Sequence, residues 1–294
     1  ARAIVDAPEL RLSTDEDRRL AERPVADVRA YECYLRARQE SWRWRKDAID
    51  RAVELLHEAL EIEPESAGLH AALGLAHLQY REAGIDLGPQ PLQDADACAR
   101  RVFALEPGSA AGLRLRGWID YSRGRVQEAV RALKAALDND PNNADALSLL
   151  ANCYLISGKV DAARPLITRL LAVDPLTPLN RCMPGFADIM EGRFDTAIEP
   201  YRLYFEMDPG NPMARLFYIW VLILNRQPGT AEQIAAAFPS ETRETIPARV
   251  ARFLVLALAG DGAGAQALAT KEIEGLAMAG DLFPRFLAQG YALA

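Results

Sequence analysis

The chain has 294 residues, of which 50% are hydrophobic and 26% are charged, and its formal net charge is −7. This composition is that of a globular chain with a large core, and the negative charge argues against a general nucleic-acid-binding protein or a basic membrane-surface module. The longest uninterrupted apolar run, Leu216–Leu224, has nine residues, whereas a membrane-spanning helix needs about 20. The sequence therefore predicts no membrane span.

Cysteine and histidine are too few and too scattered to indicate a metal site or a disulfide framework. The four cysteines (Cys33, Cys98, Cys153 and Cys182) form no C-x-x-C pair, and the chain has only three histidines. None of the phosphate-loop, nucleophile-elbow or zinc-protease motifs occurs. The sequence thus predicts no catalytic residues, no metal, no cofactor, and reduced thiols in a cytoplasmic setting.

Residues 1–29 precede the first predicted hairpin and are expected to form a lead-in segment or helix. The chain starts at Ala1 and has no charged segment followed by an apolar signal segment. This start favours a fragment excised from a longer protein.

A basic and aromatic cluster, Trp42–Arg45, lies within the first predicted hairpin, residues 30–66. Tryptophans that stack on bases and arginines that pair with phosphates would make this cluster a nucleic-acid site. The alternative is a hairpin turn whose tryptophans cap the core of the first hairpin and whose arginines face solvent. The net negative charge favours this second interpretation.

An acidic residue followed by proline recurs along the chain at a fixed spacing. Pro107, Pro141, Pro175 and Pro209 are each 34 residues apart, and Pro64 lies 43 residues before Pro107. A fixed period of this length is the signature of a repeat solenoid. The nine additional residues of the longer period are expected to form an insertion within 81–93.

Each 34-residue period is predicted to fold as two helices joined by a turn that contains glycine. In 110–143 the first helix runs to Tyr121, Gly124 supplies the turn, and the second helix begins at Val126 with apolar residues on one face. Pro141 ends the hairpin because proline lacks an N–H and restricts the residue before it. The sequence therefore predicts an all-α chain of stacked helical hairpins.

The residues at equivalent positions of these periods resemble the tetratricopeptide repeat pattern W-x2-L-G-x2-Y, A-x3-F and P. In two consecutive repeats the matching residues are Gly117, Ala129, Leu133, Pro141, Leu150, Ala151, Tyr154, Ala163 and Pro175. The resemblance implies an α-α superhelix, a right-handed solenoid of about seven repeats over residues 30–279. The expected repeats are 30–66, 67–109 with the 81–93 insertion, 110–143, 144–177, 178–211, 212–245 and 246–279, with 280–294 as the first helix of an incomplete further repeat.

In this family the first helices of the hairpins line a concave surface that binds extended peptides or partner helices. The resemblance therefore implies a partner-binding groove made of fixed positions in each repeat. These positions are Arg114, Trp118, Tyr121, Asp145, Ser148, Asn152, Cys182, Phe186 and Trp220. The carboxylate clamp that some members use for chaperone tails is not matched, because Asp145 has the wrong sign for it.

The resemblance implies a non-enzymatic scaffold that binds a protein or peptide. Residues 11–39 also resemble the entry into the repeat regions of large bacterial signalling proteins, which carry a kinase, nucleotide cyclase or DNA-binding domain. Two alternatives stay open. One is an intramolecular regulatory or dimerisation arm of a kinase or cyclase, and the weaker one is nucleic-acid binding through Trp42–Arg45.

The last predicted helix, in 280–294, has no partner helix after it. Phe283, Phe286 and Leu287 would then lack a covering surface. Two outcomes are expected from this arrangement: the chain forms a homodimer through its C-terminal end, or the last helix packs back on the repeat 246–279.

Overall fold

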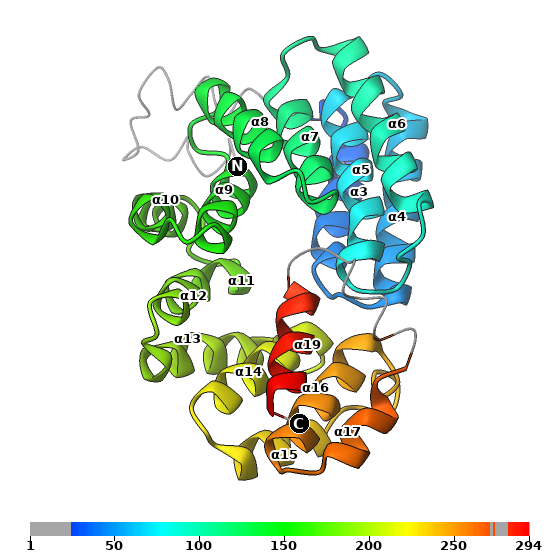
Figure 1. Cartoon of the computed structure of the whole chain (residues 1–294). Coiled ribbons are helices and arrows are strands. Elements are labelled where there is room, and N and C mark those ends of the chain that lie inside the picture. The colour runs from blue at the N-terminus through cyan, green and yellow to red at the C-terminus, as the bar shows by residue number, and fades with distance from the viewer. Residues whose placement is uncertain (1–24, 271–272, 274–281, 294) are drawn as a thin grey trace, which may run out of the picture.

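The computed structural model describes residues 25–270, 273 and 282–293, and every regular element in this part of the chain is a helix (Figure 1). The predicted lead-in segment falls largely on residues 1–24, which lie outside the described residues, as do 271–272 and 274–281 of the last predicted units. The all-α prediction is confirmed.

The helices are arranged as antiparallel pairs in chain order, and each pair packs on the next. The pairs are α3 (Val28–Ser41) with α4 (Lys46–Ile62), α5 (Ala67–Glu82) with α6 (Gln90–Leu105), α7 (Ala110–Ser122) with α8 (Val126–Asn139), and α9 (Ala144–Ile156) with α10 (Val160–Val173). They continue with α11 (Pro178–Arg181) and α12 (Met183–Met190) against α13 (Phe194–Met207), α14 (Pro212–Leu224) with α15 (Pro228–Ala236), α16 (Ile246–Leu258) with α17 (Gly262–Leu268), and finally α19 (Leu282–Leu293).

The recurring acidic residue before proline ends the second helix of a pair, and a side-chain cap begins the next pair. Asp140 leaves the helical conformation after α8, and Asn143 then accepts a hydrogen bond from the backbone N–H of Ala146 at 3.0 Å. Asn211 caps α14 in the same way two periods later. Such a cap satisfies N–H groups that have no partner within the helix.

The predicted insertion is shared between two helices and the loop that joins them. α5 has 16 residues where α7 has 13, α6 has 16 where α8 has 14, and the loop 83–89 replaces the three-residue turn of the central hairpins. Gly84 of this loop lies against α16: a Cβ added at Gly84 would be 3.1 Å from Cγ2 of Ile246. The insertion therefore connects the second hairpin to the seventh.

The fifth hairpin departs from the continuous first helix that the period predicts. Its first helix is broken into α11 and α12 at Cys182, and Pro184 lies in the first turn of α12. Proline lacks the N–H that an uninterrupted helix would need at this position. The first helix of this hairpin is therefore two short helices instead of one.

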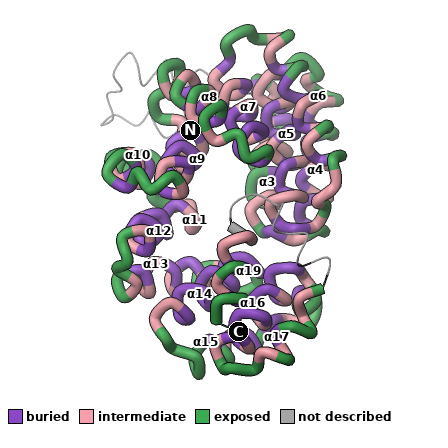
Figure 2. Tube along the Cα trace, viewed as in Figure 1, coloured by how far each residue is buried: buried purple, intermediate pink, exposed green. Residues whose placement is uncertain are grey.

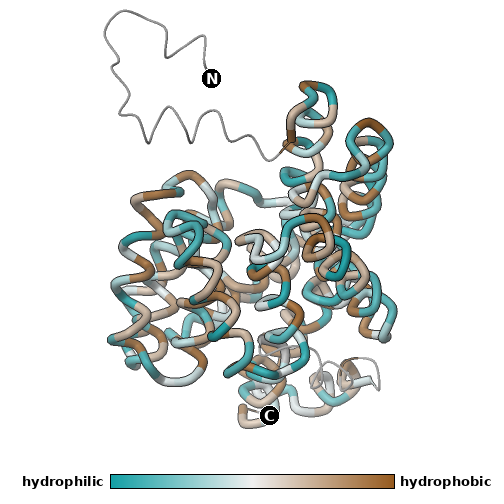
Figure 3. The backbone as a smooth tube through the Cα atoms, turned by 90° about the horizontal axis from the view of Figure 1, so that it is seen from above, coloured by the Kyte–Doolittle hydropathy of each residue, from teal (hydrophilic) through white to brown (hydrophobic). Residues whose placement is uncertain are grey.

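The stack of hairpins curves until its first and later members meet (Figure 1). The side chain of Asn211, at the start of α14, donates to the backbone oxygen of Trp42 in the α3–α4 turn at 3.1 Å, across 169 residues. Seen from above, hydrophobic and hydrophilic residues are interspersed along most of the chain (Figure 3), and the most exposed segments lie on the outer side of the curve (Figure 2). Side chains that point inward therefore converge from hairpins far apart in sequence.

This contact between the ends of the curve can be tested with a matched pair of cap residues. Asn143→Ala removes a cap and the hydrogen bond from Asn143 to Asp140, which Asn211 matches with its bond to Asp208, and we expect it to lower the free energy of unfolding by about 1 kcal/mol. Asn211→Ala removes the equivalent cap and the hydrogen bond to Trp42, so a loss of about 2 kcal/mol is expected. Urea unfolding measures both losses, and hydrogen exchange at residues 42–45 should rise only in Asn211→Ala. Equal losses and unchanged exchange would contradict closure by this bond.

The last helix, α19, packs back on α16, so the second of the two outcomes expected for it is confirmed. Phe286 is fully buried and Leu287 is 4% exposed. The prediction that these two residues lack a covering surface is wrong. The expected C-terminal homodimer depended on that uncovered surface, so this structure gives no support for it. The side chain of Phe283 lies outside the described residues. Gly290 makes the packing possible because a Cβ there would collide with the ring of Phe253.

Candidate partner-binding pocket

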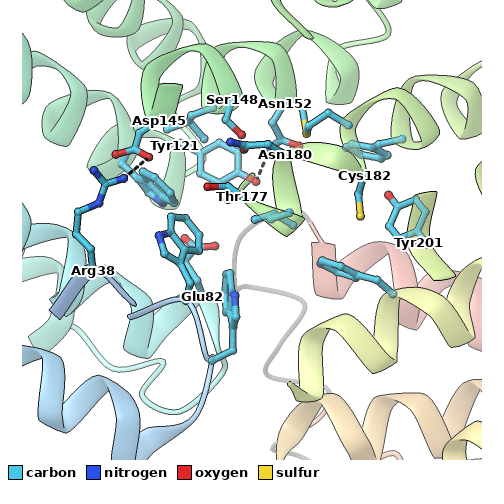
Figure 4. Close-up of a pocket in the computed structure, with 18 of the residues that line it drawn as sticks. Arg38, Glu82, Tyr121, Asp145, Ser148, Asn152, Thr177, Asn180, Cys182 and Tyr201 are labelled. Carbon is cyan, nitrogen blue, oxygen red and sulfur yellow. Dashed lines mark hydrogen bonds and ion pairs between the residues drawn. The ribbon is translucent and has the colours of Figure 1, made fainter. Parts of the chain in front are cut away.

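The inward-facing first helices enclose a cavity of about 120 Å³ near the middle of the curve (Figure 4). Its walls come from α3, the α3–α4 turn, α5, α7, α9, α11, α12, α13 and α14. Residues of the first hairpin thus face residues of the fifth and sixth across one pocket. We refer to it as the central pocket.

Eight of the nine residues that the sequence assigned to a groove line the central pocket. They are Trp118, Tyr121, Asp145, Ser148, Asn152, Cys182, Phe186 and Trp220. The ninth, Arg114, lines a smaller cavity that shares Arg38, Trp42, Trp118 and Asp145 with the central pocket. The structure brings all nine together, and their role in binding stays a prediction.

Trp42 and Trp44 also line the pocket, which differs from the location that the sequence favours for them. They were expected to cap the core of the first hairpin, but Trp44 packs with the apolar residues of the later repeats. The centroid of Trp42 lies 6.1 Å from that of Trp44 and 6.2 Å from that of Trp118. Together with Trp220, all four tryptophans of the chain therefore line one cavity. Only the curvature of the solenoid, which no local pattern gives, brings the two segments together.

The opposite wall of the pocket is a cluster of aromatic rings. Tyr201 of α13 and Phe186 of α12 each lie 6.4 Å from Trp220 of α14, with interplanar angles of 90° and 67°. Phe286 of α19 adds a third ring, 5.3 Å from Trp220. Edge-to-face pairs of this kind stabilise beyond their buried area by about 0.5–1.5 kcal/mol each.

One ion-pair network fixes the polar end of the pocket. Asp145 of α9 pairs with Arg114 of α7 and lies 3.6 Å from Nη2 of Arg38 on α3. Burial by itself raises the pKa of Asp145, but the two guanidinium groups outweigh it and hold that pKa below its usual value. The same carboxylate raises the pKa of Arg38. Both Asp145 and Arg38 are therefore charged at neutral pH.

Amide and hydroxyl groups form the rim between the ionic end and the aromatic wall. The side-chain amide of Asn152 donates to the hydroxyl oxygen of Tyr121 at 3.0 Å (Figure 4). Thr177 and Asn180 donate to Asp174 at 2.6 and 3.1 Å. These bonds fix the orientation of the polar groups that a ligand would meet.

Three of the four cysteines, Cys98, Cys153 and Cys182, are buried thiols. Burial raises the pKa of Cys98 to about 11 and that of Cys153 to about 12. Burial also raises the pKa of Cys182, although the charge of Arg181 opposes this slightly. A thiol that stays protonated is a poor nucleophile. Among the described residues, no three of the histidines, cysteines and acidic residues are grouped to hold a metal ion.

Comparison with known proteins identifies a family of repeats in this part of the chain. A family model described as tetratricopeptide repeat matches residues 121–179, which include α8, α9 and α10. The chain contains a tetratricopeptide repeat region. Part of the central pocket, including Tyr121, Asp145 and Asn152, lies within this matched stretch. No curated protein matches the sequence.

Solved structures of tetratricopeptide repeat proteins have the same fold. A protein from Parabacteroides merdae has a TM-score of 0.54 at 16% identity, and the match covers 88% of this chain and 99% of that one. A thermophilic protein from Thermus thermophilus has a TM-score of 0.50 at 19% identity, with coverage of 66% and 99%. At these identities the likeness shows the fold alone, which is a tetratricopeptide repeat solenoid.

A human IFIT1 dimer with m7Gppp-AAAA is also similar, with a TM-score of 0.63 at 16% identity. The match covers 85% of this chain and 59% of the IFIT1 chain.

None of the helices in the described part of the chain is long and apolar enough to cross a membrane.

Proposed function

We propose that this repeat region is a non-enzymatic scaffold that binds a segment of a protein or peptide in the central pocket. Proteins with this fold generally mediate protein interactions and are generally non-catalytic. The observation that carries the proposal is the convergence of all four tryptophans on one cavity lined by the inward-facing helices. Tryptophan, tyrosine and arginine are the residues that most often anchor interfaces, and all three line this pocket.

A displayed library of random peptides, selected against the whole chain, tests the proposal. Trp118→Ala and Asn152→Ala should each weaken the selected peptides at least tenfold, because each variant removes a group from the pocket wall. Tyr154→Ala is the matched control, since Tyr154 is on the same helix as Asn152 but packs under Lys134 of α8. Peptides that bind the wild type and both pocket variants equally would disprove binding in the pocket.

Nucleic-acid binding through Trp42–Arg45 is less well supported than peptide binding. Arg43 pairs with Glu40 at 3.4 Å, Arg45 pairs with Asp47, and both tryptophans lie in the pocket wall. The arginines are therefore already neutralised, and the chain carries a net charge of −7. A capped oligonucleotide such as m7Gppp-AAAA, which accompanies the similar IFIT1 structure, should show no salt-dependent binding at low salt.

The setting of this function is a further part of the proposal. We infer that the region serves as the sensory or interaction part of a larger bacterial signalling protein, on the resemblance of residues 11–39. Residues 11–24 of that stretch lie outside the described part of the chain. In the alternative arrangement, a kinase or cyclase domain of the same protein supplies the segment that enters the pocket.

A further inference from the structure

Trp44 occupies the place of a turn glycine and has a left-handed backbone. The residue two positions before the second helix is Gly124, Gly158 or Gly192 in the central hairpins, each with positive φ, whereas Trp44 has a φ of 56°. A bulky side chain in this region is strained, and such strain collects at functional sites. Arg226, the other non-glycine in this conformation among the described residues, is exposed, but Trp44 is only 7% exposed and lines the pocket.

Trp44 and Trp118 carry indole N–H groups that lack an acceptor. Both Nε1 atoms are buried, and neither has a hydrogen-bond partner among the described residues. Trp220 differs, because its Nε1–H donates to Oε1 of Gln289 at 2.6 Å. An indole N–H can only donate. The two groups therefore require an acceptor oxygen, such as a main-chain carbonyl or a carboxylate.

The chain itself shows what its aromatic wall accommodates. The ring of Phe286 of α19 lies 5.3 Å from that of Trp220, with 74° between the ring planes, and 6.2 Å from that of Phe217. Both Trp220 and Phe217 also line the central pocket, whereas Phe286 does not. The two wall residues thus already pack with one phenylalanine from a separate segment, outside the pocket.

The indole donors, rather than the net charge of the lining, disfavour a cationic ligand. Arg38, Glu82 and Asp145 line the pocket, Glu82 accepts a hydrogen bond from the hydroxyl of Ser122 at 2.9 Å, and Cζ of Arg285 lies 5.6 Å from the centroid of Phe186. The carboxylate of Asp145 is engaged by Arg114 and Arg38. The N–H edge of an indole is also its positive side, which repels a cation.

We propose that the central pocket anchors an aromatic side chain of the partner segment, while Trp44 and Trp118 donate to the carbonyl or carboxylate oxygens beside that side chain. This inference rests on the peptide-binding function proposed above. It assigns the strained backbone of Trp44 a role, since that conformation places an indole in the pocket wall where the central hairpins have a glycine.

Indole signals in a ¹H–¹⁵N spectrum test the proposal directly, because the four tryptophans give four signals and all four line the pocket. N-acetyl-phenylalaninamide should shift the Trp44 and Trp118 protons downfield as they gain acceptors, and should shift Trp220 less. N-acetyl-argininamide should leave them unchanged. Shifts with the arginine probe alone would overturn the inference and leave peptide binding standing. No shift with either probe would also overturn it, and the peptide library would then decide the proposed function separately.

Conservative variants separate the donors from the bulk of the rings. Trp44→Phe and Trp118→Phe keep an aromatic ring but remove the N–H, and each should weaken a selected aromatic peptide about five- to tenfold. Tyr154→Phe is the control outside the pocket. Unchanged affinity in both tryptophan variants, or selected peptides without aromatic residues, would overturn the inference.

Discussion

Phe286→Ala is expected to release α19 from the repeat region while the hairpins stay folded. Phe286 is fully buried against Trp220 and Phe217, and truncation of a buried phenylalanine costs about 3–5 kcal/mol. A single helix of 12 residues is marginal in water and depends on its packing for stability. The loss is therefore expected to appear as local undocking rather than global unfolding.

Hydrogen exchange and tryptophan fluorescence measure this release. Amides of 282–293 should exchange much faster in Phe286→Ala, and the fluorescence should shift to longer wavelength because Trp220 loses its cover and its bond to Gln289. Leu293→Ala is the matched control on the same helix, since Leu293 is 40% exposed. Equal exchange in the two variants would contradict docking through Phe286.

The repeat itself was predictable from sequence because its signals are local. An acidic residue before proline ends one hairpin, a glycine with positive φ turns the chain within the next, and both recur every 34 residues. The inward positions rest on the resemblance to the tetratricopeptide repeat pattern, and eight of the nine residues at those positions line one cavity.

The features that could not be predicted from the sequence are contacts between hairpins that lie far apart in the chain. Trp42 meets Asn211 only because small rotations between successive hairpins add up along the chain. Gly84 meets Ile246 for the same reason. A turn residue such as Trp44 therefore gave no local sign that it would face the later repeats rather than its own hairpin.

Asp145→Asn is expected to destabilise the chain by about 3 kcal/mol at pH 7. Asp145 and Arg114 have side chains only 16% and 10% exposed, and removal of one partner of a buried pair leaves the other charge uncompensated. Glu128→Gln is the control, because Glu128 forms an exposed pair with Arg131 at 2.9 Å. Exposed pairs contribute less than about 1 kcal/mol.

The pH dependence of this loss identifies its origin. The folded pKa of Asp145 is below its unfolded value of 3.8. The stabilisation is therefore fully present above that value and is lost as the pH falls through the folded pKa. Urea unfolding from pH 7 to pH 2 should show a constant difference between the wild type and Asp145→Asn down to about pH 5, and the difference should fall steeply towards pH 2. A difference that persists when Asp145 is protonated would show that the loss comes from packing.

Because Asp145 and Arg38 both line the central pocket, peptide affinity should fall over the same pH range if this network holds the pocket wall.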